Sequence, residues 1–314
     1  MDTAATAEVD HQRLVIQCNN EGVHMIQRGE FIEAKKLLMD ALRDFRSSTT
    51  TETQPNANAQ QPTNADVTAG DSTNDGGSSF ESLCLDQWMV SSTEALHTRL
   101  SESSTSSFFV YPKGILIPIN FFQDNANRRY CHIDVTAAIT SVVCFNQALA
   151  CQLAHIRAPA ESRDVQSLQK ASELYRLSIQ GTRQRQRRMS TSSSGDDNDN
   201  SSNNKITTNA NFLIAAMNNL AVSERIYDIS TSTATTSTTN GSAAANANAN
   251  ATSNASNNNN PQVNYQNFET LRSFLLNCRP TTSNTPEEVL WIAYLENVLR
   301  GSDLEQSNYS VIPL

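Results

Sequence analysis

The sequence predicts an all-α protein, a short α-solenoid of about three helical hairpins and a closing helix, with long disordered inserts and one short extended segment. Two observations carry this prediction. Apolar residues recur at helical spacing in four separate stretches. Between these stretches lie tracts of Ser, Thr, Asn and Ala, in a chain of 314 residues that is only 38% hydrophobic and 18% charged. An average soluble domain has roughly 45–50% apolar and about 25% charged residues.

The first hairpin is predicted over residues 11–46. Apolar residues from Leu14 to Ile26 follow the spacing of one helix face, and the pattern resumes from Phe31 to Leu42. Gly29 separates the two runs. We therefore expect two antiparallel helices joined by a short glycine turn.

Two further hairpins are predicted over residues 132–180 and 206–278 from the same periodicity. A closing helix is predicted over 285–300. Thr285 has the side chain of an N-cap residue there, and Gly301 follows where a C-cap glycine belongs.

Three internal tracts are too polar to form a packed core. They are the linker 47–79, the basic and then Ser/Asn/Asp-rich linker 181–205, and the insert 230–263 inside the third hairpin, while residues 301–314 are predicted as a tail. Ordering a residue costs about 1–2 kcal/mol of backbone entropy. Because the three internal tracts bury almost no apolar surface, they are predicted to be disordered.

Residues 80–131 are predicted to be a mixed extended and helical segment. Within it, Phe108–Pro118 is aromatic and β-branched, contains two prolines and a Pro-Lys-Gly turn, and is typical of an extended stretch or a small hairpin. Its apolar side chains would be unfavourably exposed to water unless they packed against other apolar residues. We therefore expect it to pack along the helical core.

Small residues stand at matching places in the three predicted hairpins. Gly22 and Ala34 lie where the two helices of the first hairpin approach each other, and Ala148 and Ala221 align with Gly22 in the second and third. With Gly29 at the turn of the first unit, the chain resembles the tetratricopeptide repeat. The three units together cover somewhat over a third of the chain, and the resemblance implies a solenoid that binds another protein.

Asn20, Asn146 and Asn219 each lie two residues before one of these small residues. The resemblance places this position on the concave groove of the solenoid. A side-chain amide offers a donor and an acceptor, which suits it to hold the backbone of an extended peptide. Equally, such an asparagine ladder could pin neighbouring helices together. The predicted partner-binding groove comprises Asn19, Asn20, Val23, Phe145, Asn146, Leu149, Asn218, Asn219, Val222 and Arg225.

The resemblance also argues against one kind of partner. The carboxylate-clamp subgroup of the family uses Lys and Arg on the first helices, whereas Arg225 is the only cation near the ladder here. A chaperone-tail adaptor is therefore not expected. The prediction is a non-enzymatic adaptor without cofactor or metal, which binds an unidentified protein or peptide.

Composition excludes further classes of ligand and location. The net charge of −9 disfavours nucleic acid, since phosphate contacts need clustered Lys and Arg. No run approaches the ~20 apolar residues of a membrane helix, and no secretory signal is evident at Met1–Ala5. The six cysteines form no C-x-x-C pair. We expect an intracellular protein, cytoplasmic rather than nuclear.

A rival interpretation is an enzyme or metal-binding protein that uses Cys and His residues near 131–155. Cys144, Cys151 and His155 fall on one side of the predicted helix, and Phe108–Pro118 would act as a lid over them. A buried helix face explains the same spacing.

One candidate modification site lies in the predicted basic linker. Arg185 and Arg187 precede Ser190 by five and three residues, a pattern that basophilic protein kinases recognise. A phosphate there would add about −1.5 to −2 charge beside the arginines. Phosphorylation of Ser190 is therefore predicted as a possible regulatory step.

Overall fold

The structure, a computed structural model, describes residues 3–50, 85–93, 108–119, 132–191, 209–238, 262–278, 288 and 290–299. Most of the tracts predicted to be disordered, the tail and the cap residues Thr285 and Gly301 lie outside the described residues. Every regular element within them is helical, which confirms the predicted all-α class.

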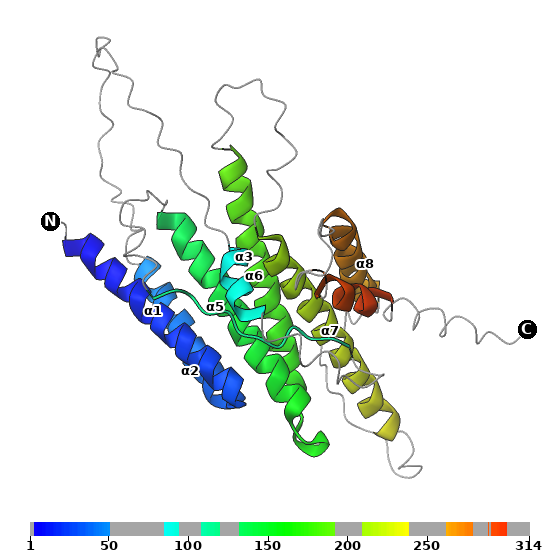
Figure 1. Cartoon of the computed structure of the whole chain (residues 1–314). Helices are drawn as coiled ribbons and strands as arrows, with labels where there is room; N and C mark the ends of the chain where they lie inside the picture. Colours follow the sequence, from blue (N-terminus) through cyan, green and yellow to red (C-terminus); the bar gives the residue numbers. More distant parts are fainter. Residues whose placement is uncertain are drawn as a thin grey trace, which may run out of the picture.

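The helices are α1 (Thr3–Arg28), α2 (Phe31–Thr50), α3 (Leu85–Thr93), α5 (His132–Arg157), α6 (Val165–Thr191), α7 (Ala210–Thr238) and α8 (Gln262–Asn277), and a last helix, Leu290–Leu299, follows α8. A short 3-10 turn, Ala160–Ser162, joins α5 to α6. Helices α1 and α2, α5 and α6, and α7 and α8 pack as pairs. Contacts of α2 with α5 and of α6 with α7 join each pair to the next, so that the long helices form a row (Figure 1).

The first pair has the predicted turn at Gly29. Its φ of 84° is a conformation that glycine adopts without a side-chain clash. The Gly29 N–H donates to the Ile26 carbonyl at 3.1 Å, and the Glu30 N–H donates to the Met25 carbonyl at 2.9 Å. These two bonds satisfy carbonyls at the end of α1 in the manner of a Schellman motif.

The small residues lie at close approaches between helices, as predicted. A Cβ added to Gly22 would lie 2.8 Å from Cγ of Leu38 in α2. Ala34, Ala148 and Ala221 are buried. A larger side chain at these places would push the paired helices apart.

Helix α5 lies at the centre of the row and contacts α1, α2, α6 and α7. The most apolar 18-residue window of its stretch Asp134–Arg157 has a mean hydropathy of 1.4, and the stretch is long and apolar enough to cross a membrane, contrary to our expectation that no such run exists. However, 83% of its most apolar window is buried inside the protein. Its composition is that of a core helix surrounded by other helices.

Helix α3 packs over the beginning of α7. The Asp86 carboxylate accepts hydrogen bonds from the backbone N–H groups of Asn211 at 3.1 Å and Phe212 at 2.9 Å, and so caps α7. Burial raises the pKa of Asp86, although these N–H bonds act in the opposite direction. The predicted segment 80–131 therefore does contribute a helix that packs on the core.

Three predicted boundaries are wrong. Helix α2 continues to Thr50, α6 to Thr191 and α7 to Thr238, each into a tract predicted to be a linker or an insert. Each residue added to an existing helix gains a hydrogen bond without a new nucleation step. In α7 the Thr231 hydroxyl also donates to the Tyr227 carbonyl at 3.1 Å.

Glu224 of α7 joins three helices, because Arg176 of α6 and Asn267 of α8 both donate to its carboxylate. The net effect of its surroundings is to raise the pKa of Glu224, because burial outweighs the opposing effect of Arg176. A carboxyl whose pKa is raised on folding stabilises the fold most below its unfolded pKa, and less as the pH rises.

Glu224→Gln is therefore expected to raise the melting temperature at pH 7. The gain should vanish near pH 4, since the wild-type carboxyl is then largely protonated. Thermal denaturation followed by circular dichroism at both pH values measures this difference. A lower melting temperature for the variant at pH 7 would show that the ion pair with Arg176 outweighs burial.

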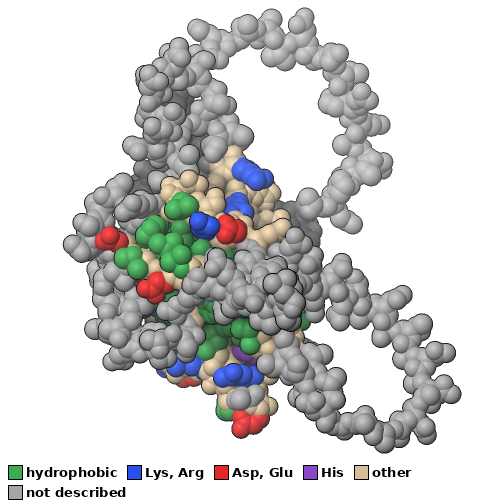
Figure 2. Space-filling view, turned by 90° about the vertical axis from the view of Figure 1, so that its right-hand side faces the viewer, with side chains coloured by type: hydrophobic (Ala, Val, Ile, Leu, Met, Phe, Trp, Pro, Cys, Tyr) green, Lys and Arg blue, Asp and Glu red, His purple; other side chains and the backbone are tan. Residues whose placement is uncertain are grey.

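Figure 2 shows the end of the row where α8 and the last helix lie, with hydrophobic side chains gathered on it. Among the side chains that the structure describes on these two helices, the exposed large hydrophobic residues are Leu276, Ile292 and Leu299.

Candidate functional site

An extended segment, residues 108–119, crosses the row of helices on one face (Figure 1). We call it the strap. It contains neither a strand nor a hairpin, so the predicted hairpin alternative is wrong, and the expected packing along the helices is confirmed. Tyr111, Ile115 and Ile117 are buried, in agreement with the alternation of an extended chain.

The asparagines of α1 and α5 hold the C-terminal half of the strap. The Ile117 N–H donates to Oδ1 of Asn20 at 2.9 Å, and Nδ2 of Asn20 donates to the Ile117 carbonyl at 2.7 Å. Asn146 makes the same pair of bonds with Ile115, both at 2.8 Å. Each side-chain amide thus binds both backbone groups of one residue.

The other half of the strap is held in the same way. The Tyr111 N–H donates to Oδ1 of Asn219 at 2.8 Å, and Nδ2 of Asn219 donates to the Tyr111 carbonyl at 3.1 Å. Asn297 of the last helix pairs with the N–H and carbonyl of Phe109 at 2.8 and 2.6 Å. The ladder therefore spans α1, α5, α7 and the last helix.

The asparagine amides bind backbone groups of the strap rather than its side chains. In an extended chain the N–H and carbonyl of one residue point to the same side, as they do toward a neighbouring strand. The clamped residues of the strap are all odd-numbered, whereas Pro112 and Pro118 are even-numbered. Proline has no N–H, so it fits only the positions that no asparagine clamps.

The asparagines also bind one another between helices. Asn146 donates to Oδ1 of Asn19 at 2.8 Å, and Asn297 donates to Oδ1 of Asn218 at 2.7 Å. Asn19 in turn donates to the Ile115 carbonyl at 3.1 Å. The ladder therefore links neighbouring helices, which is one of the two predicted roles, and the extended backbone that it holds is the chain's own strap rather than a partner peptide.

Other residues of the predicted groove have different positions. Val23 packs on the strap so closely that a Cβ added to Gly114 would lie 2.8 Å from its Cγ2. The ring of Phe145 lies 6.2 Å from that of Tyr111, centroid to centroid, in a T-shaped contact. Leu149 and Val222 are buried, while Arg225 is partly exposed. Burial raises the pKa of Asp228, and the nearby charge of Arg225 opposes this increase.

Asn297 was not predicted. The residue two places after it is Leu299, whereas a small residue follows the other ladder asparagines at this distance. The Asn-x-small pattern was therefore too strict to find it. The order Asn-x-apolar on the last helix was the available signal.

The arginine-rich residues 183–188, which were predicted to begin a linker, are helical and belong to α6. Ser190 lies within α6, so the expected flexible surroundings of this phosphorylation candidate are wrong. The run also divides by helix face. Arg185 is only 1% exposed and donates to Oδ1 of Asn209 at 3.5 Å, whereas Arg183 and Arg187 are exposed.

The residues proposed for the rival interpretation lie in the core of α5. Cys144 and Cys151 are buried, and burial raises the pKa of Cys151 to about 11. Nδ1 of His155 donates to the Asp164 carbonyl at 3.0 Å. Among the described residues, no group of three or more His, Cys, Asp or Glu side chains could hold a metal ion, and Cys131 lies outside them.

Comparisons with protein-family models, with curated proteins and with solved structures found no match to this chain.

Proposed function

We propose that this chain is a non-enzymatic, tetratricopeptide-like solenoid that acts as an interaction scaffold and binds an extended peptide along its ladder of asparagines. The observation that carries the proposal is the pairing of four asparagines with both backbone groups of the strap residues Phe109, Tyr111, Ile115 and Ile117. The packing order of the helices supports a solenoid, since each helix pair contacts the next.

The strap is the resident ligand of this groove. It fills the face on which a partner peptide would lie, and Asn19, Asn146, Asn218 and Asn219 are buried beneath it. A partner peptide therefore binds by exchange with the strap. Its required features are an extended backbone, N–H groups at the clamped positions, and apolar side chains at the places of Tyr111, Ile115 and Ile117.

Substitutions that weaken the binding of the strap to the groove should make the groove available to an added peptide. Ile115→Asp combined with Ile117→Asp places two charges in buried positions while the ladder is unchanged. A fluorescein-labelled synthetic peptide with the sequence of residues 108–119 is expected to bind this variant at least tenfold more tightly than it binds the wild-type chain. Fluorescence anisotropy measures both affinities, and circular dichroism checks that the helices remain folded.

The matched control is the same peptide with an N-methylated backbone at residues 111 and 115. It keeps both apolar side chains but lacks two of the clamped N–H groups, and it should lose most of the binding. Adding Asn146→Ala to the strap-weakened variant should have a similar effect. If the folded variant binds both peptides equally or binds neither, the groove does not accept a peptide by backbone pairing.

A further inference from the structure

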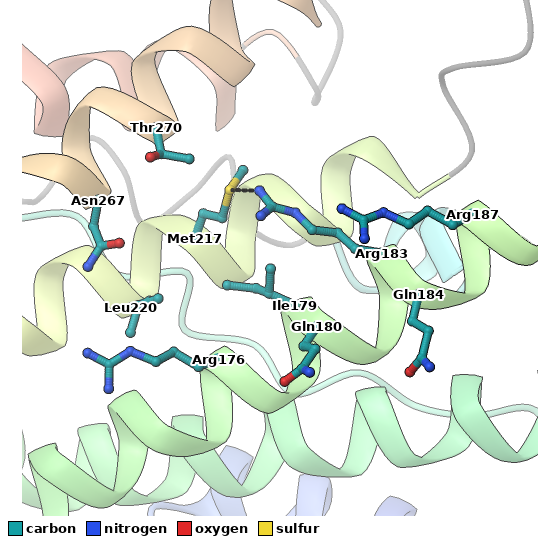
Figure 3. A pocket seen from close by; sticks show the side chains of 10 residues that line it. All are labelled: Arg176, Ile179, Gln180, Arg183, Gln184, Arg187, Met217, Leu220, Asn267 and Thr270. Atoms are coloured by element: carbon teal, nitrogen blue, oxygen red, sulfur yellow. Dashed lines mark hydrogen bonds between the residues drawn. The ribbon is translucent and has the colours of Figure 1, made fainter.

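A second groove lies away from the strap, between α6 and α8, with α7 as its floor. Its volume is about 560 Å³, within the range of ligand-binding pockets. Arg176, Arg183 and Arg187 of α6 line it together with Ile179, Met217 and Leu220 (Figure 3). We call it the arginine groove.

The helical repeat places these cations on one side of α6. Positions 176, 183 and 187 follow the i, i+7, i+11 spacing of a single helix face, and all three side chains are exposed. Like charges at i and i+4, as at Arg183 and Arg187, weaken a helix.

The present partners of these arginines differ. Arg176 is paired with Glu224. Nη2 of Arg183 donates to Sδ of Met217 at 3.4 Å, and a thioether is a weak acceptor for a guanidinium (Figure 3). A carboxylate that entered the groove would replace this contact with a charge-assisted bond.

The spacing fits carboxylates on an extended peptide. With a rise of 1.5 Å per residue, Arg183 and Arg187 are separated by about 6 Å along the helix. Side chains on one face of an extended chain recur every ~6.7 Å. The apolar side chains of Ile179, Met217 and Leu220 suit an apolar side chain of the peptide, and the exposed amide of Gln180 can bind a peptide backbone.

We propose that the arginine groove is a second binding site, which takes an acidic, extended peptide segment of a partner protein. A nucleic acid is the weaker fit, because the chain has a net charge of −9 and would repel a polyanion outside the groove. The site is independent of the ladder, so the strap can occupy its own groove while the arginine groove is filled.

The test uses the full wild-type chain and a fluorescein-labelled octapeptide of alternating Glu and Leu. Fluorescence anisotropy should show binding that weakens as salt is raised, since the contacts are between exposed charges. Arg183→Gln combined with Arg187→Gln should weaken binding at least tenfold. The matched control Arg188→Gln removes a charge from the same helix end outside the groove and should change the affinity less than twofold.

Four outcomes would overturn the proposal. One is no binding of the acidic octapeptide, and another is an equal loss with Arg188→Gln, which indicates attraction to the helix end alone. The third is tighter binding of a single-stranded RNA octamer than of the peptide. An octapeptide with Gln in place of Glu should bind at least tenfold more weakly, and equal binding would also contradict the proposal. Circular dichroism of each variant confirms that α6 is intact.

Discussion

Replacing Asn146 by alanine is expected to lower the free energy of unfolding by about 2–4 kcal/mol, which corresponds to a fall of roughly 5–15 °C in melting temperature for a domain of this size. Asn146 is buried and binds the N–H and carbonyl of Ile115 as well as Oδ1 of Asn19. Without the amide, the Ile115 N–H has no partner in a place that water does not reach. An unpaired buried backbone group costs about 1–3 kcal/mol.

Asn20→Ala is the matched comparison, because Asn20 makes the same pair of bonds at the partly exposed end of the strap. Water can replace its amide there, and we expect a loss of about 1 kcal/mol. Urea denaturation of the two variants measures the difference. Hydrogen exchange of the strap should rise more for Asn146→Ala than for Asn20→Ala.

Asn146→Asp separates hydrogen bonding from packing. The carboxylate keeps the shape of the amide but loses the donor, so it faces the Ile115 carbonyl and Oδ1 of Asn19 as a buried anion. The variant should be less stable than Asn146→Ala at pH 7 and should recover part of the loss near pH 4. If all three variants lie within about 0.5 kcal/mol of the wild type, the ladder does not hold the strap.

The helices and most of the ladder could be predicted from the sequence. Apolar spacing marks the buried faces, and the small residues Gly22, Ala148 and Ala221 mark the close approaches. Because Asn20, Asn146 and Asn219 each precede one of these small residues by two positions, it could also be inferred that the three asparagines lie on the same face of the helix row. The pinning of neighbouring helices was one of the two predicted roles, whereas the binding of the chain's own extended segment was not predicted.

That the strap is the segment bound by the ladder could not be predicted in the same way. Asn20 and Asn219 bind strap residues that are 97 and 108 positions away in the sequence. The entropy of closing a loop rises only slowly with its length, so sequence distance does not indicate which segment folds back. A ladder that binds N–H and carbonyl groups also leaves little side-chain signal, because every residue except proline offers the same two groups.

Replacing Tyr111 by alanine is expected to cost about 3–5 kcal/mol, the usual loss for truncating a buried aromatic side chain. Tyr111 is fully buried at the middle of the strap, and its ring contacts Phe145 of α5. Phe145 in turn packs against Tyr175 of α6 and Phe212 of α7. The cavity would therefore lie where three helices and the strap meet, and little of it could close by local movement.

Tyr111→Phe is the matched control, since it keeps the ring and removes only the hydroxyl. That hydroxyl is buried and has no hydrogen-bond partner among the described residues, so we expect no loss of stability or a gain of about 1 kcal/mol.

Burial raises the pKa of Tyr111, and a phenol whose pKa is raised on folding loses its stabilising contribution as the pH rises. Urea denaturation near pH 7 and again near pH 10.5, above the ordinary pKa of tyrosine at about 10, should show a smaller alkaline loss for Tyr111→Phe than for the wild type. Equal alkaline losses, or a clear destabilisation by Tyr111→Phe at pH 7, would mean that the hydroxyl is hydrogen-bonded and that the strap is held at Tyr111 by more than its backbone and ring.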